Sequence, residues 1–377
     1  MAPVFSRPRP ISLPDDVLRA IASLLPVSDL IRLVRVSKAL HAAGAPVLYR
    51  SVETCIDPGD WVRDHVLNNR PIEVLLTIIT SCFPHRFKSV PSRLYAAHIV
   101  TFSYVSWCLP MDFRAVPLLA EALRFTHKLR HLRVDVGVDA LPLVLDVFSR
   151  SSIIITPSTT LAITSNADRF SLPCLQSIRS GRIAIVEALM SYRAIQTVAI
   201  DLCLEEDELA KFLYAGPVWK PAHLRQLSLS LACFSPSSVL LEGIVGAFPQ
   251  LEHLALRVLS SCAIEYMEDA LGMLSDLPAC GRSLRTIGIN HGGLFDKLVD
   301  GLRGLQTVIA EGCSHRPALR EVVLGDCMWA RENVFGEWSF VTSIGVSRWP
   351  WLLCKNEGEW GPKFGPATKS YQHRRFY

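Results

Sequence analysis

The sequence predicts an α/β protein in which a three-helix unit near the N-terminus precedes a long repeat solenoid with a parallel sheet and convex helices. A stretch of about 40 residues near the N-terminus has the apolar spacing and the punctuation of three short helices. A short apolar pattern then recurs at intervals typical of stacked repeats. Helical spacing fills the segments between the recurrences, so strands and helices should alternate.

The three helices are predicted within residues 11–52. Four residues mark their limits: Ser12 can cap the first helix, Pro26 ends it, Ser37 caps the third and Gly44 stops it. The second helix should begin at residue 28 or one residue earlier, and a strand over residues 50–53 should follow the third.

The first helix carries one apolar stripe, made of Val17, Leu18, Ile21, Leu24 and Leu25. A unit of this size cannot bury much apolar surface by itself. The stripe is wider than one three-helix core needs, so some of its side chains are expected to meet a partner. The alternative is that these are simply the first helices of a globular core, and the pattern alone leaves both possibilities open.

Residues 11–52 resemble the F-box motif. The matching elements occur in order and at the right spacing: Leu13-Pro14 before an acidic pair, Val17-Leu18, Ile21, Leu24, Asp29-Leu30, Leu33, Val36-Ser37 and Leu48-Tyr49. Two positions differ from the usual motif. Leu40 stands where many members carry Trp or Phe, and the closing aromatic residue is Tyr49 rather than Trp. The resemblance implies docking on the Skp-type adaptor of an SCF ubiquitin ligase and, through it, on the cullin. The adaptor-binding side chains it implies are Leu13, Pro14, Val17, Leu18, Ile21, Leu30, Leu33 and Val36.

Composition bears on the location of the protein and on whether it binds nucleic acid, forms disulfides or holds zinc. Half of the 377 residues are apolar, mean hydropathy is +0.27, and no stretch of 18 apolar residues lacks a charge. Without a signal peptide or a membrane span, we expect an intracellular protein, cytoplasmic, nuclear or both. The net charge of +4 and the short basic run 373–375 do not predict nucleic-acid binding. The 11 cysteines contain no C-x-x-C pair, which argues against a disulfide scaffold or a zinc cluster.

From residue 98 three apolar residues recur at positions i, i+3 and i+5, and we call them anchors. Successive copies start 30, 66, 29, 27, 33 and 35 residues apart. The gap of 66 suggests a degraded copy starting at Ser158, with Leu161 and Ile163 as anchors, which gives about eight copies. The clear copies are Ile99-Phe102-Tyr104, Leu129-Leu132-Val134, Ile195-Val198-Ile200, Leu224-Leu227-Leu229, Leu251-Leu254-Leu256, Leu284-Ile287-Ile289 and Leu319-Val322-Leu324.

This period predicts a leucine-rich-repeat-like solenoid over residues 98–328. It resembles the irregular leucine-rich segments that follow the F-box in many F-box proteins. The anchors should point into the core while the residues between them face outward. Small or polar residues are expected where each strand turns away, at Cys108, Gly137, Asn166, Cys203, Cys233, Gly292 and Cys327.

Helical spacing occupies most of the remaining chain. Residues 53–97 should form a helical linker, with helices over 61–67 and from Pro71 onward, the latter buried through Ile72, Leu75, Leu76 and Ile79. Between the strands, helices are expected around 117–125, 205–214, 267–274 and 294–309.

The C-terminal composition changes after residue 328. Five tryptophans fall within residues 329–360, so residues 329–365 are expected to cap the solenoid. The alternative is an aromatic partner-binding surface. Residues 1–10 and 366–377 should be a flexible lead-in and a mobile tail.

No constellation of residues predicts catalysis. Neither a phosphate-binding loop nor a nucleophile elbow occurs, so His291-Gly292-Gly293 is interpreted as a glycine turn. Cys313 and His315 supply only two metal ligands, and the acidic run 205–208 suits a solvated helix start. We therefore expect no enzyme activity, no catalytic residues, no cofactor and no metal.

The prediction is a substrate receptor that docks on the adaptor through residues 11–52 and binds an unknown target protein through the repeats. Candidate target-facing residues are Arg130, Arg133, Asp135, Arg225, Gln226, Ser228, Glu252, His253, Arg257, Arg285, Glu321 and Asp326. The alternatives are a repeat scaffold without a ligase role and an enzyme of unknown class.

Overall fold

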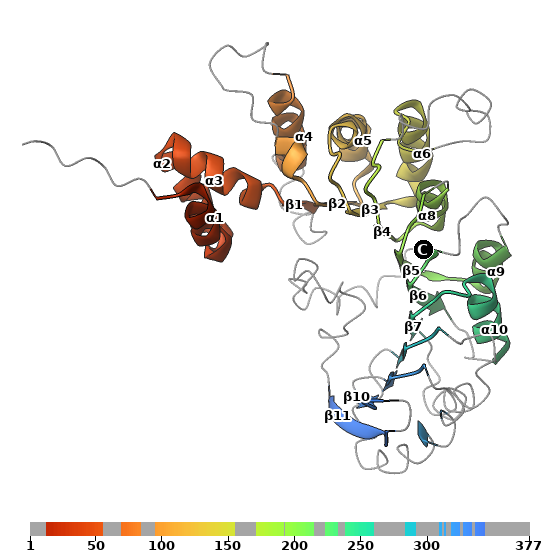
Figure 1. Cartoon of the computed structure of the whole chain (residues 1–377). Helices are drawn as coiled ribbons and strands as arrows, with labels where there is room; N and C mark the ends of the chain where they lie inside the picture. The colour runs from red at the N-terminus through yellow and green to blue at the C-terminus, as the bar shows by residue number, and fades with distance from the viewer. Residues whose placement is uncertain are drawn as a thin grey trace, which may run out of the picture.

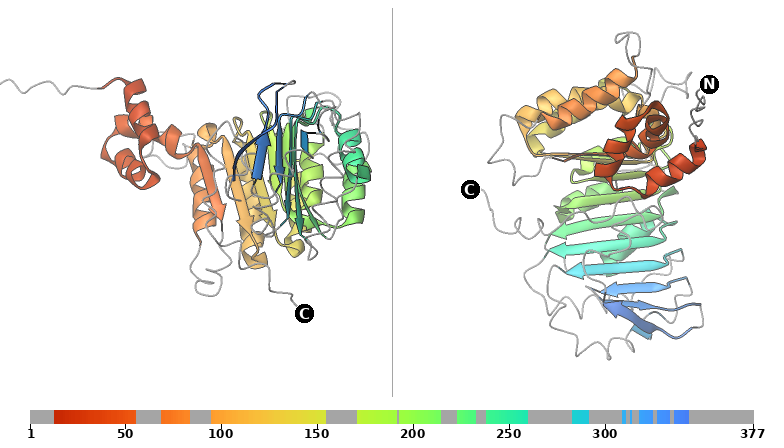
Figure 2. Two further views of the ribbon diagram at one scale, coloured as in Figure 1. Left: turned by 90° about the horizontal axis from the view of Figure 1, so that it is seen from below. Right: turned by 90° about the vertical axis from the view of Figure 1, so that its left-hand side faces the viewer.

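The computed structural model is a mixed helix and sheet protein built around one 11-stranded sheet. Three N-terminal helices project from one end of this sheet (Figures 1 and 2). The structure describes residues 13–55, 69–83, 95–154, 171–191, 193–214, 223–232, 238–259, 283–291, 309–310, 313, 318–324, 327–333 and 336–343.

The N-terminal helices are α1 (Asp15–Leu24), α2 (Val27–Val36) and α3 (Lys38–Leu48). Pro26 separates the first two and occupies the N-cap position of α2, as predicted. The Ser37 hydroxyl accepts a hydrogen bond of 3.1 Å from the Leu40 backbone N–H, which confirms it as the cap of α3. The cap expected from Ser12 is wrong, because Pro14 holds the N-cap position of α1 and its carbonyl accepts from the Leu18 N–H.

The expected stop at Gly44 is also wrong, because α3 continues through it to Leu48. Gly44 is buried where α3 crosses α2, and a Cβ there would lie 2.7 Å from Val34 Cγ1. The glycine therefore serves close helix packing rather than termination. Pro46 is also inside this helix.

The sheet follows the chain from one edge to the other, in the order β1 to β11. Neighbours from β1 to β9 pair in parallel, whereas β9, β10 and β11 pair antiparallel. The strands are β1 (Ser51–Cys55), β2 (Thr101–Ser106), β3 (His131–Val136), β4 (Ser177–Ser180), β5 (Thr197–Leu204), β6 (Gln226–Ala232), β7 (His253–Leu259), β8 (Thr286–His291), β9 (Glu321–Leu324), β10 (Cys327–Ala330) and β11 (Ser339–Ser343).

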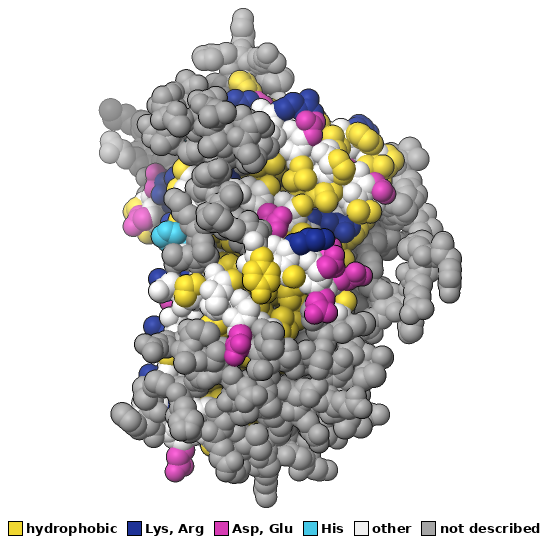
Figure 3. All heavy atoms as spheres, turned by 90° about the vertical axis from the view of Figure 1, so that its right-hand side faces the viewer, with side chains coloured by type: hydrophobic (Ala, Val, Ile, Leu, Met, Phe, Trp, Pro, Cys, Tyr) yellow, Lys and Arg dark blue, Asp and Glu magenta, His cyan; other side chains and the backbone are white. Residues whose placement is uncertain are grey.

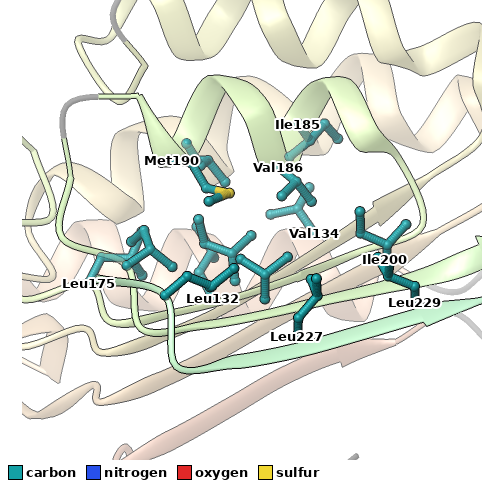
Figure 4. Close-up of a cluster of buried hydrophobic side chains, with 14 of the residues drawn as sticks. Leu132, Val134, Leu175, Ile185, Val186, Met190, Ile200, Leu227 and Leu229 are labelled. Atoms are coloured by element: carbon teal, nitrogen blue, oxygen red, sulfur yellow. The ribbon is translucent and has the colours of Figure 1, made fainter. Parts of the chain in front are cut away.

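All anchors of the seven clear copies are buried, each at most 3% exposed. The second and third anchors align in register across the parallel strands, so each row packs into the next (Figure 4). This continuous core joins the strands to the helices that cover one face of the sheet. The apolar pattern therefore identified the inward positions correctly.

The degraded copy was placed wrongly. The strand between β3 and β5 is β4, which pairs directly with both, so the intermediate copy begins at Leu175 rather than Ser158. Its buried anchors are Leu175, Ile178 and Ser180. The pattern of three apolar residues does not match this copy because the third anchor is a serine. Leu161 and Ile163 lie outside the described residues.

Helices of the described part of the chain cover the outer, convex side of the curved sheet (Figure 1). They are α4 (Arg70–Ser81), α5 (Leu109–Arg124), α6 (Leu141–Arg150), α8 (Ile183–Met190), α9 (Glu206–Tyr214) and α10 (Ser238–Ala247). Charged and hydrophobic side chains are interspersed on part of this outer side (Figure 3). The helix expected at 205–214 is confirmed by α9, and that around 117–125 begins earlier than expected, at Leu109.

Details of the helical predictions need correction. Leu76 is 42% exposed, and Ile78 takes its place on the buried face of α4, because that face follows residues 72, 75 and 78. The helices expected at 61–67 and 267–274, and most of that at 294–309, lie outside the described residues.

The positions at which each strand was predicted to turn away agree only in part with the structure. Cys108 and Gly137 are the N-caps of α5 and of the short 3-10 helix Val138–Ala140, as expected for places where the chain leaves a strand. Cys203 instead lies inside β5, after an irregularity in its pairing, and Cys327 begins β10. Asn166, Cys233 and Gly292 are not among the described residues.

The C-terminal strands close the described sheet with buried aromatic side chains. Trp329 and Trp338 are at most 4% exposed and belong to the hydrophobic core. The Arg331 guanidinium lies 4.9 Å from the ring of Trp338, and its Nε donates a hydrogen bond of 2.7 Å to the Leu319 carbonyl. For these two tryptophans burial agrees with a capping role, while Trp349, Trp351 and Trp360 lie outside the described residues.

Two kinds of feature are absent from the described residues. None of the helices there is long and apolar enough to cross a membrane. No group of three or more His, Cys, Asp or Glu side chains there is arranged to hold a metal ion.

Candidate docking site

An exposed apolar surface follows α1 and α2. We define the docking stripe as the large apolar side chains of residues 13–36 that are more than a third exposed: Leu13, Val17, Ile21, Leu24, Val27, Ile31 and Val36. Leu24 and Val36 stand out, with 85% and 71% of their surface exposed. Apolar side chains gathered this densely on one small unit are characteristic of a protein-binding surface.

Helix geometry explains the split between exposed and buried residues. Leu13, Val17, Ile21 and Leu24 recur every three or four residues, so they share one side of α1. Leu18 and Ala22 are on a different side and are buried. Leu30 is the buried residue of α2, and Gly44 allows α3 to pack closely there.

The eight side chains expected to bind the adaptor differ in their exposure to solvent. Leu13, Pro14, Val17, Ile21 and Val36 are exposed, and Leu33 is half-buried. Leu18 and Leu30 are at most 9% exposed, which gives them a place in the core of the three helices. As contact residues these eight stay a prediction. Leu24, Val27 and Ile31 were missed, although the spacing of Leu24 on α1 already placed it on the apolar stripe.

The charges around the docking stripe belong to exposed side chains. Asp15, Asp16 and Arg19 are exposed on α1, and Asp29 and Arg32 form an ion pair of 3.6 Å on α2. Such exposed pairs stabilise little, so the stripe is the distinctive physical feature of this unit.

A second candidate site, made of charged side chains, lies on the face of the sheet opposite the helices. We call it the charged cluster: Arg133 and Asp135 on β3, Arg179 on β4 and Asp201 on β5. Arg133 and Arg179 are register partners, so two like charges lie side by side. Asp201 Oδ2 accepts from Arg179 Nε at 2.7 Å and lies 3.5 Å from Arg133 Nη2, which relieves their repulsion.

Asp135 adds a second carboxylate to the charged cluster, 3.8 Å from Arg133 Nη2. Burial raises the pKa of Asp135, while Arg133 opposes that shift and Asp201 adds to it. Sequence reasoning named Arg133 and Asp135 as outward-facing but missed Arg179 and Asp201. Arg179 was missed because β4 was not identified.

The remaining target-facing candidates differ in exposure. Arg130, Arg257 and Arg285 are exposed, whereas Arg225, Gln226, Ser228, Glu252, His253 and Glu321 are half-buried; Asp326 lies outside the described residues. Glu252, just before β7, pairs with a residue before each neighbouring strand and lies 3.2 Å from Arg225 Nη1 and 3.5 Å from Arg285 Nε. These three side chains therefore link neighbouring segments at the surface of the sheet.

Comparison with protein families matches residues 11–54 to the F-box-like domain. No curated protein matches the chain. The match covers α1 to α3 and most of β1, the region that carries the docking stripe, and F-box domains typically bind Skp-type adaptors. Residues 11–54 are therefore similar to an F-box-like domain, and the similarity indicates adaptor binding as the role of this part of the chain.

Proposed function

We propose that this protein is a substrate receptor of an SCF-type ubiquitin ligase. The three N-terminal helices dock on the Skp-type adaptor, and the sheet holds a target protein. The observation that carries the proposal is the docking stripe within the F-box-like residues 11–54.

The docking step follows from the exposure of the stripe. Complete burial of one aliphatic side chain contributes about 1.5–3 kcal/mol. Several such side chains on α1 and α2 can therefore supply the apolar centre of a stable interface, with the flanking charges as its polar rim. Leu18 and Leu30 are buried in the core of the three helices, so they support the stripe from within.

The target-binding step is assigned to the sheet. Seven recurring triplets of buried anchors, with β4 as the irregular copy, support a leucine-rich-repeat-like solenoid for residues 98–328. Its strands place residues in register on the face opposite the helices, where Arg257 of β7 is exposed while the charged cluster is largely buried. Such a face suits recognition of a protein segment because parallel strands present side chains at regular intervals.

The chain contributes proximity rather than chemistry in this proposal. A receptor that holds a target beside the ubiquitin-charged enzyme raises the effective concentration of the target's lysines near the thioester. The bond-forming groups then belong to the partner enzymes, in line with the expectation of no enzyme activity here.

Charge substitution in the docking stripe tests the docking step. Val36→Asp changes a side chain that is 71% exposed, so the fold should tolerate it. A carboxylate buried against an apolar partner is unfavourable by several kcal/mol, so adaptor affinity should fall by about a hundredfold or more. Val138→Asp is the matched control, since Val138 is 61% exposed but follows β3 in the sheet.

Size-exclusion chromatography of the purified chain with the adaptor gives the result. Wild type and Val138→Asp should co-elute with the adaptor, while Val36→Asp and the pair Leu13→Ala with Pro14→Ala should elute apart from it. If wild type does not co-elute, or if Val36→Asp binds as well as Val138→Asp, the docking role is refuted and a repeat scaffold without a ligase role becomes the better account.

A further inference from the structure

The joint between the three helices and the sheet is short. Helix α3 ends at Leu48 and β1 starts at Ser51, so only Tyr49 and Arg50 connect them. Backbone hydrogen bonds restrain both residues, because the Tyr49 N–H donates to the Ala45 carbonyl at 2.9 Å and the Arg50 carbonyl accepts from the Val100 N–H at 2.9 Å. Side chains add a further connection across this joint.

An aromatic stack closes the joint. The ring of Tyr49 lies against that of Tyr95, with centroids 4.0 Å apart and planes 9° from parallel. Tyr49 is the C-cap residue of α3, whereas Tyr95 begins the 3-10 helix η3 (Tyr95–His98), which precedes β2. The stack therefore joins residues from the two sides of the joint, 46 positions apart in the sequence.

His41 makes a second side-chain contact to Tyr95, at its hydroxyl group. Its Nδ1 lies 3.2 Å from the Val34 carbonyl of α2, to which it can only donate. In the neutral ring Nε2 is then an acceptor, and the Tyr95 hydroxyl lies 3.4 Å from it. Tyr95 is thus held by both its face and its hydroxyl, and through His41 it is tied to α2 as well as α3.

Tyr95 is also fixed on the side of the sheet. The next residue, Ala96, is 1% exposed, and its carbonyl accepts a hydrogen bond of 3.2 Å from the N–H of Ile99, the first anchor of the first copy. Side chains and backbone therefore form a continuous connection from α2 to the core of the sheet.

We propose that Tyr95 is a positioning residue, held by Tyr49 and His41, that locks the three N-terminal helices to the sheet as one rigid unit. The rigidity itself does not depend on any partner. Its consequence rests on the proposed function: a docking stripe fixed relative to the sheet would hold a bound target at a constant distance and angle from the adaptor.

Distance measurements on the full chain test this lock. Nitroxide labels are attached through a genetically encoded keto amino acid at Arg32 on α2 and Arg150 on α6, because the chain contains 11 cysteines and both arginine side chains are well exposed. Double electron–electron resonance then reports the distribution of distances between the helices and the sheet.

Three variants separate the lock from general stability. Tyr95→Ala and Tyr49→Ala each remove one ring of the stack, so one can serve if the other does not fold. Phe83→Ala is the matched control, because Phe83 forms an edge-to-face pair with Phe125 at 5.4 Å and neither ring takes part in the Tyr49–Tyr95 stack. We expect the two joint variants to broaden the distance distribution about twofold or more, while the control keeps the wild-type width.

The inference is overturned if both joint variants keep the wild-type width, or if Phe83→Ala broadens it equally. Adaptor affinity gives an independent readout, since Tyr95 is outside the docking stripe. Tyr95→Ala should bind the adaptor within about twofold of wild type. A chain that never binds the adaptor would refute the proposed function while leaving the distance measurement interpretable.

Discussion

Asp201→Asn should destabilise the protein strongly, because Asp201 is the carboxylate that the two arginines of the charged cluster share. Arg133 and Arg179 are register partners on adjacent strands, and Asp201 Oδ2 lies 3.5 Å from the first and 2.7 Å from the second. Asparagine keeps the shape of the side chain but removes its charge. Two arginines then remain side by side, and the Asp135 carboxylate still lies 3.8 Å from Arg133.

The burial of the charged side chains determines how much stability Asp201→Asn should lose. Removing one partner of a fully buried ion pair costs about 3–5 kcal/mol, whereas exposed pairs contribute about 0–1 kcal/mol. The side chains of Arg133, Arg179 and Asp201 are 10%, 18% and 23% exposed, close to the buried limit. We therefore expect a loss of about 2–3 kcal/mol in the free energy of unfolding.

Urea unfolding followed by circular dichroism measures this loss. Asp207→Asn is the matched control, because Asp207 pairs with Lys211 at 3.1 Å but the two side chains are 64% and 76% exposed. The control should lose far less stability, because exposed pairs contribute little. Equal losses in the two variants would refute the reasoning, since burial would then not decide the strength of these pairs.

Two further substitutions test the helix packing at Gly44 and the buried carboxyl group of Asp112. Gly44→Ala should destabilise the protein by about 1–2 kcal/mol despite the better helix propensity of alanine, because its Cβ would lie 2.7 Å from Val34 Cγ1. Adding Val34→Ala should recover most of this loss in urea unfolding, and additive losses would contradict the packing argument. Burial raises the pKa of Asp112, and the hydrogen bond of 2.7 Å from the Tyr104 hydroxyl offsets part of that rise. The contribution of Asp112 to stability is therefore complete below its ordinary pKa of 3.8 and is lost as the pH rises through the raised pKa of the folded protein. Asp112→Asn should remove this decline between pH 4 and 7 in thermal unfolding, and an unchanged pH dependence would contradict it.

The buried rows of the sheet could be predicted because their signal is local and recurs along the chain. One triplet of anchors has little meaning alone, but seven triplets at similar spacing specify the buried rows of a sheet, and all their members are buried. The copy at Leu175 was missed because Ser180 is buried in a place where the pattern required an apolar residue. Its hydroxyl accepts a hydrogen bond of 3.0 Å from the Arg182 backbone N–H, an interaction that only the folded chain reveals.

The candidate docking site could be predicted only in part. Periodicity identifies the apolar positions of α1 and α2, but the packing of α3 decides which of them are buried. Leu18 and Leu30 were therefore grouped with exposed residues. The interpretation of Gly44 as a helix stop failed for the same reason, because its role depends on contact with Val34 of another helix.

The charged cluster shows a further limit of the sequence. Alternation along a strand indicates that Arg133 and Asp135 face away from the anchors. It does not reveal that Asp201, 66 residues beyond Asp135, binds Arg133, since that contact depends on the register of β3, β4 and β5.

Titration calorimetry of the full chain with a purified Skp-type adaptor tests the proposed function most directly. We expect one adaptor to bind per chain with submicromolar affinity and a negative heat-capacity change, as burial of the apolar docking stripe requires. It also predicts that Leu24→Asp, at a side chain 85% exposed, abolishes the binding heat without changing the unfolding curve of the chain. No binding by wild type, or undiminished binding by Leu24→Asp, would contradict the account.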